Sequence, residues 1–374
     1  MNKQTECRIG VIGAANIAKK IWTAAARAGG AHIAAVAARH PSRAETFVDE
    51  CQRDVPMISG DRIVDVKTTD YESMIASDDI DAVYLPIPTS LRIDWAVAAA
   101  KSGKHVLIEK PAAVHSDDLR RLDEAARSAG VTWMDGVMFD HSPRTAAIAD
   151  AIAQGAVGQV RRIATHFSFA GDEAFFKNDI RVRSDLEPHG ALGDLGWYGI
   201  RFTLRCRPER TVESVRGQTL WDVDGVPAEF EGQMRFDDGA IGSVFCSFRS
   251  ANQQTAVVSG SDAYLTVDDF VLQFNGSSAD FDVHRHDLDI DRCRWIFNRR
   301  TQTTSVAAYS HGERGASEVN MIERLAARFR GEDDSGGSFD PARVSMATQR
   351  IVDAMRSSDV RGGVWTPPEF ESAD

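Results

Sequence analysis

The sequence predicts an α/β protein of two domains: an N-terminal doubly wound parallel sheet of the Rossmann type, and a C-terminal α+β domain with a large, mainly antiparallel open sheet. The chain has 374 residues, more than the roughly 250–300 that one core usually supports. Strand-like segments alternate with helical ones through residues 7–138, as in a parallel sheet. Short alternating segments separated by tight turns fill residues 211–286, as in an antiparallel sheet. We therefore expect domains at 1–138 and 139–374.

The composition is that of an ordinary globular protein, with 43% hydrophobic and 26% charged residues. The net charge of −12 argues against a nucleic-acid partner, because phosphate backbones are bound by basic faces. No apolar run approaches the ~20 residues of a membrane span, and the N-terminus shows no signal-peptide pattern. The five cysteines are scattered without metal-ligand spacing, which predicts reduced thiols, a cytoplasmic location and no metal site.

A glycine-containing turn follows the first predicted strand. The first 38 residues have the order strand, helix, strand, and the turn reads Gly13-Ala14-Ala15-Asn16-Ile17-Ala18, a G-x-A-x-x-A pattern. Gly13 permits a tight turn and the small Ala15 permits close approach of the backbone. A pyrophosphate could then bind the bare N–H groups at the helix N-terminus. The pattern predicts a dinucleotide held by Gly13, Ala15, Asn16 and Ile17.

The second strand ends in residues that discriminate between the two nicotinamide cofactors. An NAD site usually carries an Asp or Glu there, to bind the ribose 2′-hydroxyl. Here Arg39 and Arg43 flank Ser42 instead. A guanidinium pairs well with a 2′-phosphate, so the sequence favours NADP, with NAD possible. The alternative is that both arginines are solvated at a helix start.

Two later strand ends supply further candidates at the carboxyl edge of the sheet, where ligands of such sheets bind. Residues 82–85 lead into a proline-containing turn, and residues 106–108 form an apolar run that ends in a carboxylate and an ammonium. The cofactor candidates at these ends are Pro86, Pro88, Leu91, Glu109 and Lys110. Taken alone, Lys110 reads as a surface lysine at a strand end, as most lysines are, and only the rest of the chain favours a functional role.

The second domain contains a glycine-rich segment, residues 190–201, that carries Asp194 and Tyr198 on one helix face. Four glycines would weaken a free helix, but they suit a backbone that approaches another surface closely, such as a bound cofactor. Asp194 and Tyr198 can act as an orienting group and a proton donor. The alternative is a core aromatic residue and a solvated carboxylate.

A long polar connection, residues 171–189, precedes that segment and suggests a functional loop. Lys177, Arg181 and His189 are its candidates for contacts with substrate hydroxyl or carboxylate groups. A surface position is the alternative for each.

The rest of the second domain predicts strands and two helices. Residues 271–274 read as a strand before an Asn275-Gly276 turn, residues 285–300 as a solvated or interface segment, and residues 316–330 and 341–357 as amphipathic helices. An open sheet leaves one face to be covered, so we expect a homodimer or homotetramer formed through this sheet.

Several strings resemble the glucose–fructose oxidoreductase/inositol dehydrogenase (Gfo/Idh/MocA) family of NAD(P)-dependent oxidoreductases. They are Ile12 to Ala18, Pro88-Thr89-Ser90-Leu91, the highly specific Gly103-Lys104-His105-Val106-Leu107-Ile108-Glu109-Lys110-Pro111, and the segment that ends in Asp194-Leu195-Gly196-Trp197-Tyr198. A tyrosine at the position of Tyr198 resembles the sugar-oxidoreductase and dihydrodiol-dehydrogenase branch, whereas inositol dehydrogenases carry His there. The segment as a whole is similar to uncharacterised plant-type members. Arg92 stands where many members have His, and Asp140 departs from the family pattern, so neither is assigned a contact.

The resemblance implies reversible hydride transfer between NADP(H) and a carbonyl or secondary alcohol of a sugar-like or diol substrate. Tyr198 would protonate the developing alkoxide. A nearby Lys110 ammonium would lower its ordinary pKa near 10, and Asp194 would orient the pair. Two rivals remain: a glycosidase that uses NAD without net redox change, and a dinucleotide sensor that has lost turnover. A sensor would need none of the three catalytic residues.

Overall fold

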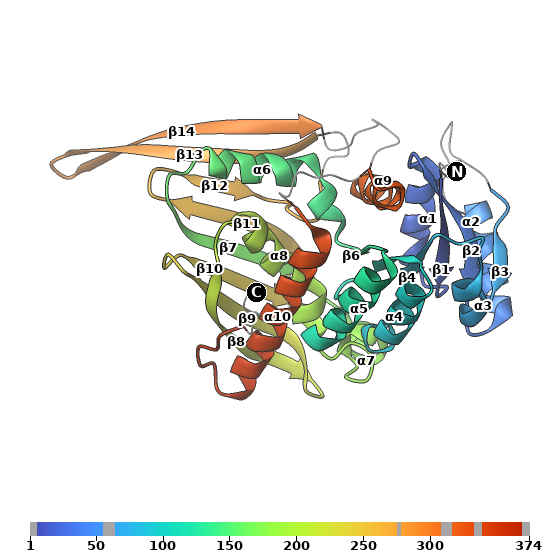
Figure 1. Ribbon diagram of the computed structural model, residues 1–374. Helices are drawn as coiled ribbons and strands as arrows, with labels where there is room; N and C mark the ends of the chain where they lie inside the picture. The colour runs from blue at the N-terminus through green and yellow to red at the C-terminus, as the bar shows by residue number, and fades with distance from the viewer. Residues whose placement is uncertain (1–5, 55–63, 275–277, 308–315, 333–338, 369–374) are drawn as a thin grey trace. The chain divides into compact units, whose positions relative to one another are not determined.

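A computed structural model describes residues 6–54, 64–274, 278–307, 316–332 and 339–368 of the chain (Figure 1). The chain forms two compact units. The first consists of Met1–His141, Asp185–Pro188 and Tyr309–Gln349, and the second of Ser142–Ser184, His189–Ala308 and Arg350–Asp374. The units are therefore interleaved along the chain, and each is described by itself.

The first unit contains a six-stranded parallel sheet in the order β3-β2-β1-β4-β5-β6. The strands are β1 (Cys7–Ile12), β2 (Ala31–Ala37), β3 (Lys67–Thr69), β4 (Ala82–Leu85), β5 (His105–Ile108) and β6 (Trp133–Asp135). Strands β4 and β6 are buried along their whole length, which is why they read as apolar runs. This order is the doubly wound arrangement, and it confirms the predicted fold class of this half.

The helices of the first unit bury one apolar stripe each. They are α1 (Ala18–Arg27), α2 (Pro41–Asp54), α3 (Tyr71–Ala76), α4 (Ile93–Lys101), α5 (Ser116–Ala129) and α9 (Ser317–Arg330), with two short 3₁₀ turns, η1 (Thr89–Leu91) and η2 (Met138–His141). In α5, for example, Leu119 and Leu122 are buried, and Gly130 ends the helix with φ of 69°. Late in the chain, α9 returns to this unit, where the Asn320 side chain donates to the His141 carbonyl at 2.9 Å.

The second unit contains an eight-stranded sheet in the order β14-β13-β12-β11-β7-β10-β9-β8. Only β7 and β10 pair in parallel, so the predicted, mainly antiparallel sheet is confirmed. The strands are β7 (Val160–Ser168), β8 (Val212–Val223), β9 (Val226–Phe236), β10 (Ile241–Ser247), β11 (Gln253–Gly260), β12 (Tyr264–Val267), β13 (Ser278–Asp291) and β14 (Arg294–Ala307).

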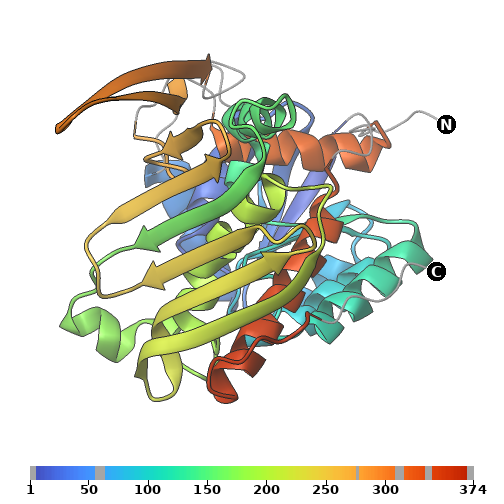
Figure 2. The same cartoon turned by 90° about the vertical axis from the view of Figure 1, so that its left-hand side faces the viewer.

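The helices of the second unit cover one face of this sheet. They are α6 (Pro143–Ala153), α7 (Glu173–Asn178), η3 (Ile180–Val182), the π-helical turn η4 (Leu192–Gly196), α8 (Trp197–Arg205) and α10 (Pro341–Val360), of which residues from Arg350 onward belong to this unit. A Cβ on Gly217 of β8 would lie 2.7 Å from the Met355 carbonyl oxygen of α10, so helix and strand are in close contact. Figure 2 looks onto the opposite face, on which no described helix lies. We call it the bare face.

One sequence expectation in this half needs correction. The predicted strand at Val271–Phe274 is wrong: this segment is held by the Gln254 side chain, which bonds both the N–H and the carbonyl of Leu272 at 2.6 Å. These side-chain bonds replace a strand ladder. The Asn275-Gly276 turn lies outside the described residues. Residues 285–300, expected to be a solvated or interface segment, are mostly exposed and form the distal part of one long hairpin of β13 and β14.

Gly199 allows α8 to lie directly on the sheet, which makes the spacing between them testable. A Cβ there would be 2.5 Å from Thr165 Oγ1 and 3.0 Å from Val244 Cγ1. We expect Gly199→Ala to lower the free energy of unfolding by roughly 1–3 kcal/mol, because the core must be displaced. Gly29→Ala is the matched control, since its Cβ would meet no atom closer than 3.6 Å, and we expect a change within about 0.5 kcal/mol. Urea unfolding measures both, and equal effects would contradict the prediction.

Candidate active site

The glycine turn after β1 has the geometry of an anion cradle. Gly13 has φ of 119°, and a Cβ there would lie 2.5 Å from Ile87 Cγ2, so only glycine fits. The first local bond into α1 is donated by the Ala18 N–H, to the Ala15 carbonyl at 2.9 Å. The amides of residues 14–17 therefore lie ahead of the helix, where bare N–H groups bind phosphate. This turn fits the pyrophosphate of a dinucleotide.

Two guanidinium groups follow β2. Arg43 Nη2 lies 3.5 Å from the Ala14 carbonyl, so it reaches the glycine turn itself. The charge of Arg39 acts on Tyr71, where it opposes the burial that raises the pKa of that phenol. Arg39, Ser42 and Arg43 are all exposed. The residues predicted to select NADP thus present positive charge beside the cradle, as a 2′-phosphate requires.

The end of β5 is organised around the Glu109 carboxylate. Tyr84 OH donates to its Oε1 at 2.5 Å and the Lys110 N–H to its Oε2 at 3.1 Å. Burial, followed by the charge of Glu109, raises the pKa of Tyr84 well above its ordinary value, so the phenol stays a donor. A Cβ on Gly136 would lie 3.2 Å from both carboxylate oxygens. Glu109 therefore anchors the backbone of Lys110 through its N–H. The Lys110–Pro111 peptide bond is cis.

Arg92 is a buried guanidinium that connects this strand end to the neighbouring one, at 3% exposure. Its Nη1 donates to the carbonyls of Glu109 and Pro111, both at 2.5 Å. Its Nε and Nη2 donate to the carbonyl of Ile87 at 2.9 and 2.6 Å. Burial lowers its pKa, while the charges of Glu187 and Glu109 oppose that shift. No role was predicted for Arg92 from the sequence. The one indication was that it stands where many family members have His.

The turn after β4 is also tied to a distant segment of its own unit. Thr89 donates to the Glu187 carboxylate through its N–H at 2.9 Å and through its hydroxyl at 2.6 Å. The Ser90 hydroxyl donates to the Asp185 carbonyl at 2.6 Å. Among the predicted cofactor residues of this turn, Pro88 precedes η1 and Leu91 is 46% exposed. Glu187 was not predicted, because its partner lies 98 residues away.

In the second unit, Asp194 and Tyr198 lie on either side of the junction between η4 and α8. Asp194 Oδ2 pairs with Arg181 Nε at 3.0 Å, so two predicted site residues are brought together. Tyr198 is 8% exposed, and its ring packs edge-on against Phe167 with centroids 5.7 Å apart. π-helical turns such as η4 often occur at functional sites.

The glycines around this junction have a different role from the one expected. A Cβ on Gly196 would lie 3.3 Å from Cys246 Sγ, and one on Gly199 would clash with β7 and β10 as described. At these two positions the closely approached surface is the sheet, rather than a cofactor. The residues that position Tyr198 thus include the core of its own unit.

The remaining substrate candidates differ in their surroundings. Lys177 of α7 pairs with Glu173 at 2.6 Å and is 67% exposed, the state of a solvated i,i+4 pair. His189 is 5% exposed. It precedes Gly190, whose φ of 48° and close approach to the Pro227 carbonyl leave no room for a side chain. His189 therefore starts the segment that leads to Asp194 from a fixed backbone position.

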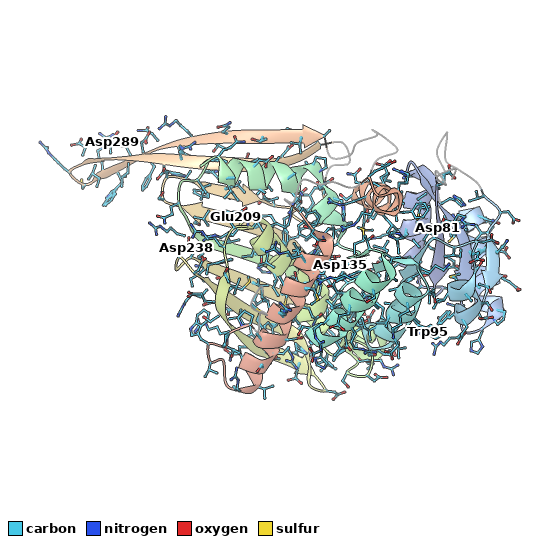
Figure 3. All side chains as sticks on the ribbon, viewed as in Figure 1. Asp81, Trp95, Asp135, Glu209, Asp238 and Asp289 are labelled. Atoms are coloured by element: carbon cyan, nitrogen blue, oxygen red, sulfur yellow. The ribbon has the colours of Figure 1, made fainter. Side chains whose placement is uncertain are left out.

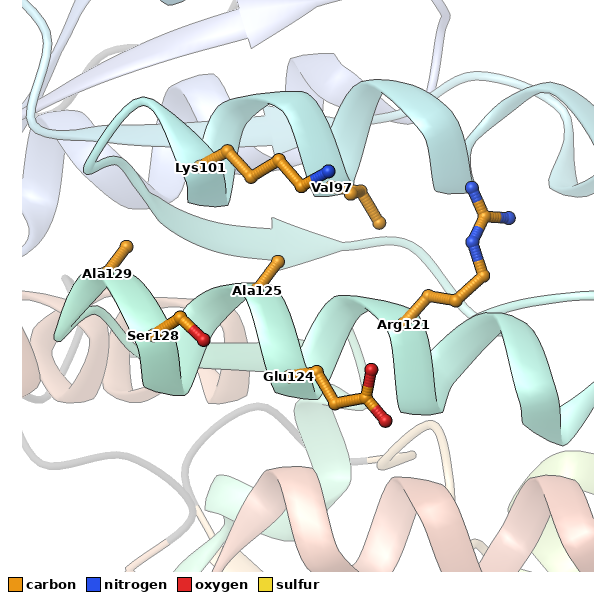
Figure 4. A pocket seen from close by; sticks show the side chains of 7 residues that line it. All are labelled: Val97, Lys101, Arg121, Glu124, Ala125, Ser128 and Ala129. Atoms are coloured by element: carbon orange, nitrogen blue, oxygen red, sulfur yellow. The ribbon is translucent and has the colours of Figure 1, made fainter.

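A groove of about 420 Å³ lies elsewhere, between α4 and α5 of the first unit (Figure 4). It is lined by Val97, Lys101, Arg121, Glu124, Ala125, Ser128 and Ala129, none of which is a predicted site residue. Its arginine is already paired with Asp94 at 2.9 Å. We assign it no ligand. Among the described residues, no group of three His, Cys, Asp or Glu side chains could hold a metal ion.

Comparison with known proteins places the chain in a family. Residues 7–137 match the model "Oxidoreductase family, NAD-binding Rossmann fold", and residues 145–266 match the GFO/IDH/MocA C-terminal domain. D-xylose 1-dehydrogenase (NADP(+)) 2 of Haloferax volcanii is 32% identical over 257 residues, which cover 68% of this chain and 74% of that protein. The chain belongs to the Gfo/Idh/MocA family of oxidoreductases. The predictions of this family and of an NAD(P)-dependent oxidoreductase are confirmed.

Two other relatives extend over nearly the whole chain. The dTDP-3,4-didehydro-2,6-dideoxy-alpha-D-glucose 3-reductase of Streptomyces violaceoruber is 29% identical over 94% of this chain and 95% of that protein. KijD10, a 3-ketoreductase from Actinomadura kijaniata solved with NADP and TDP-benzene, has a TM-score of 0.77 and 24% identity, and the match covers 95% and 98% of the two chains. At that identity the structural likeness establishes the fold. Within the described residues, every helix is too short or too polar to cross a membrane.

The bonds of Arg92 predict a specific sensitivity to substitution. We expect Arg92→Lys to lower the free energy of unfolding by about 3 kcal/mol, because one ammonium cannot reach three buried carbonyls on two loops. Arg120→Lys is the control, since Arg120 forms an exposed pair with Glu124 at 2.9 Å, and we expect less than about 0.5 kcal/mol. Urea unfolding measures the stability, and amide hydrogen exchange of residues 86–92 and 109–112 measures the loops. Unchanged exchange in Arg92→Lys would show that Arg92 does not hold them.

Proposed function

We propose that the protein is an NADP-dependent oxidoreductase that transfers hydride reversibly between NADP(H) and a carbonyl or secondary alcohol of a sugar-like or diol substrate. The observation that carries the proposal is the common position of Gly13 and Lys110. They follow the parallel strands β1 and β5, which are separated only by β4, at one sheet edge. Two strand spacings correspond to roughly 10 Å. An anion cradle and an ammonium thus belong to one ligand-binding edge.

The bound cofactor supplies or accepts the hydride, and the chain handles the proton. Residues 13–17 and the strand-end residues Arg39, Ser42, Arg43, Pro86, Pro88, Leu91 and Glu109 are proposed to hold the cofactor. Tyr198 donates its phenol proton to the developing alkoxide, with Lys110 stabilising the phenolate that remains. Asp194 orients these groups, and its ion pair with Arg181 supports a fixed, ionised carboxylate.

The relatives' names and the site chemistry support a polyhydroxylated substrate. A xylose dehydrogenase and a deoxyhexose 3-reductase are among them, and so is the trans-1,2-dihydrobenzene-1,2-diol dehydrogenase of Mus musculus. We propose His189 and Arg181 as substrate contacts ahead of Lys177, because the Lys177 ammonium is exposed and paired. A buried imidazole and a guanidinium can hydrogen-bond several hydroxyl groups.

We also propose roles for the two domains, an oligomeric state and a cellular setting. Residues 1–138 are proposed to bind the cofactor and residues 139–374 to bind the substrate. The bare face is proposed to join copies in a homodimer or homotetramer. Four of the five cysteines are buried and all five are free, which supports a reducing, cytoplasmic setting.

Removal of the Tyr198 hydroxyl tests the chemistry directly. We expect Tyr198→Phe to lower kcat roughly 10²–10⁴-fold, the usual contribution of a positioned acid, while the Kd for NADPH stays within about twofold. The substrate is first found with a carbonyl and aldose panel followed at the nicotinamide absorbance band. Tyr264→Phe, at a half-buried tyrosine of β12 in the same unit, should leave kcat unchanged. Near-normal turnover of Tyr198→Phe would remove the proposed proton donor, and bond cleavage without net absorbance change would favour the glycosidase alternative.

Removal of the two arginines tests cofactor choice. We expect Arg39→Ala/Arg43→Ala to weaken NADPH binding about 10–100-fold, because one or two charged hydrogen bonds to the 2′-phosphate are lost. NADH binding should change less than about threefold, since NADH has no such group. Arg53→Ala, at an exposed arginine in the last turn of the same helix α2, is the control. Fluorescence titration measures each Kd, and an equal loss for NADPH and NADH would contradict the assignment.

A further inference from the structure

Between the predicted substrate residues Arg181 and His189, four residues of the chain belong to the first unit. They are Asp185–Pro188, whereas the residues before them, up to Ser184, and after them, from His189 on, belong to the second unit. We call residues 185–188 the strap. The strap forms neither helix nor strand, so its position depends on other bonds.

Hydrogen bonds fasten the strap to η1, the turn that follows β4. The N–H and the hydroxyl of Thr89 donate to the two carboxylate oxygens of Glu187, at 2.9 and 2.6 Å. The N–H of Ser90 donates to the Leu186 carbonyl at 3.2 Å, and its hydroxyl donates to the Asp185 carbonyl at 2.6 Å. Glu187 thus satisfies both a buried hydroxyl and one of the N–H groups that a helical turn leaves unpaired at its start.

Glu187 is also a counter-charge for the buried Arg92. Arg92 donates to the carbonyls on either side of Lys110. Burial lowers the pKa of Arg92, and the charge of Glu187 is the strongest of those that oppose this shift. Other charged groups at the ends of these strands are buried as well, among them Glu109 and Asp135, which Figure 3 labels. Because removing one partner of buried charges is costly, the strap completes the electrostatics of the edge at which the cofactor is proposed to bind.

On its C-terminal side the strap leads directly into the segment that begins η4. Only Pro188, whose ring fixes one backbone dihedral, separates Glu187 from His189. His189 is buried, and the next residue, Gly190, has φ of 48° and lies against the Pro227 carbonyl. A link this short and stiff transmits any displacement of Glu187 to the backbone of His189.

On its N-terminal side three residues separate the strap from Arg181. Asp179 Oδ1 accepts the Arg181 N–H at 2.9 Å, and the Arg181 guanidinium pairs with Asp194 at 3.0 Å. Residues 181–194 therefore form a loop whose two ends are joined by an ion pair and whose middle is fastened through Glu187. We call it the closed loop. Its three predicted site residues are thus connected to one carboxylate.

We infer that Glu187 is a positioning residue, through which a cofactor bound at residues 86–91 sets the arrangement of Arg181, His189 and Asp194. The inference rests on the proposed function, in which this turn contacts NADP(H) and the closed loop contacts substrate. A dinucleotide that immobilises the turn stabilises the strap bonded to it, and with the strap the closed loop. By linkage, substrate then binds more tightly to the cofactor-loaded enzyme than to the free enzyme. Groups that are arranged before substrate arrives lower the cost of its binding.

Amide hydrogen exchange of the full chain, with NADP⁺ as the probe, tests this coupling without a substrate. In the wild type we expect NADP⁺ to slow exchange about fivefold or more at residues 13–18, and also at residues 189–194. Glu187→Gln removes the charge and one acceptor at nearly unchanged size. It should keep the protection at residues 13–18 and reduce that at residues 189–194 to less than about twofold. Thr89→Val, which removes the hydroxyl donor, should act in the same direction.

Glu173→Gln is the matched control. Glu173 is an exposed carboxylate of the same polar connection and pairs only with Lys177, at 2.6 Å, so NADP⁺ should protect both segments as in the wild type. Once a substrate is found with the carbonyl and aldose panel, Glu187→Gln should raise its KM about fivefold or more at saturating NADPH. Glu173→Gln should change that KM less than about twofold.

Three results would overturn the inference while leaving the cofactor site intact. The first is protection of residues 13–18 without protection of residues 189–194 in the wild type. The second is full protection of both segments in Glu187→Gln. The third is faster exchange of residues 189–194 in Glu187→Gln by the same factor with and without NADP⁺, which would mean that Glu187 only stabilises the loop. Absence of protection at residues 13–18 in the wild type would instead refute the proposed cofactor site, and the inference would fall with it.

Discussion

The carboxyl edge of the first sheet depends on one buried guanidinium. Arg92 donates hydrogen bonds to backbone carbonyls that follow two adjacent strands. One is the carbonyl of Ile87, after β4, and the others are those of Glu109 and Pro111, on either side of Lys110. Loop carbonyls at strand ends have no ladder partner, and leaving them unsatisfied in the interior is costly. A guanidinium satisfies three at once because its donors form a rigid planar fork. The same contacts fix the direction of the backbone from which Lys110 projects. In this chain the family's histidine position therefore serves the architecture of the edge.

Local patterns were sufficient to predict the first sheet, the turn at Gly13 and the position of Lys110, because strand, turn and helix follow one another directly in the sequence. Asp194 and Tyr198 were predicted from spacing and family resemblance. Arg92 and Glu187 were missed because their partners are backbone groups or residues far along the chain. Residues 271–274 were misassigned because an apolar run favours a strand, and a single glutamine side chain overrides that preference. The β14 strand was missed because charged residues dilute its apolar alternation.

Glycines are required in this chain for two different physical reasons, which the sequence alone cannot tell apart. Gly13 is required by its backbone conformation and by the lack of space for a side chain, at the place where a ligand is expected. Gly196 and Gly199 have ordinary helical conformations and are required by the sheet beneath them. Close packing of this kind leaves a helix little freedom to shift. A phenol carried on such a helix is positioned by the core, which is what a proton donor requires.

A long hairpin with one apolar face carries a risk of aggregation, because its free edges can pair with any other strand. In the hairpin of β13 and β14 that risk is opposed by charge. Arg294, Arg299 and Arg300 are spaced along β14, at the edge of the sheet, and aspartates alternate along β13. Two β14 edges approaching each other would bring arginines together, and repulsion disfavours that contact. The apolar pairs Leu288–Phe297 and Ile290–Trp295 lie on one face of the hairpin, perpendicular to its edges. The charges of this hairpin therefore disfavour open-ended pairing along its free edge.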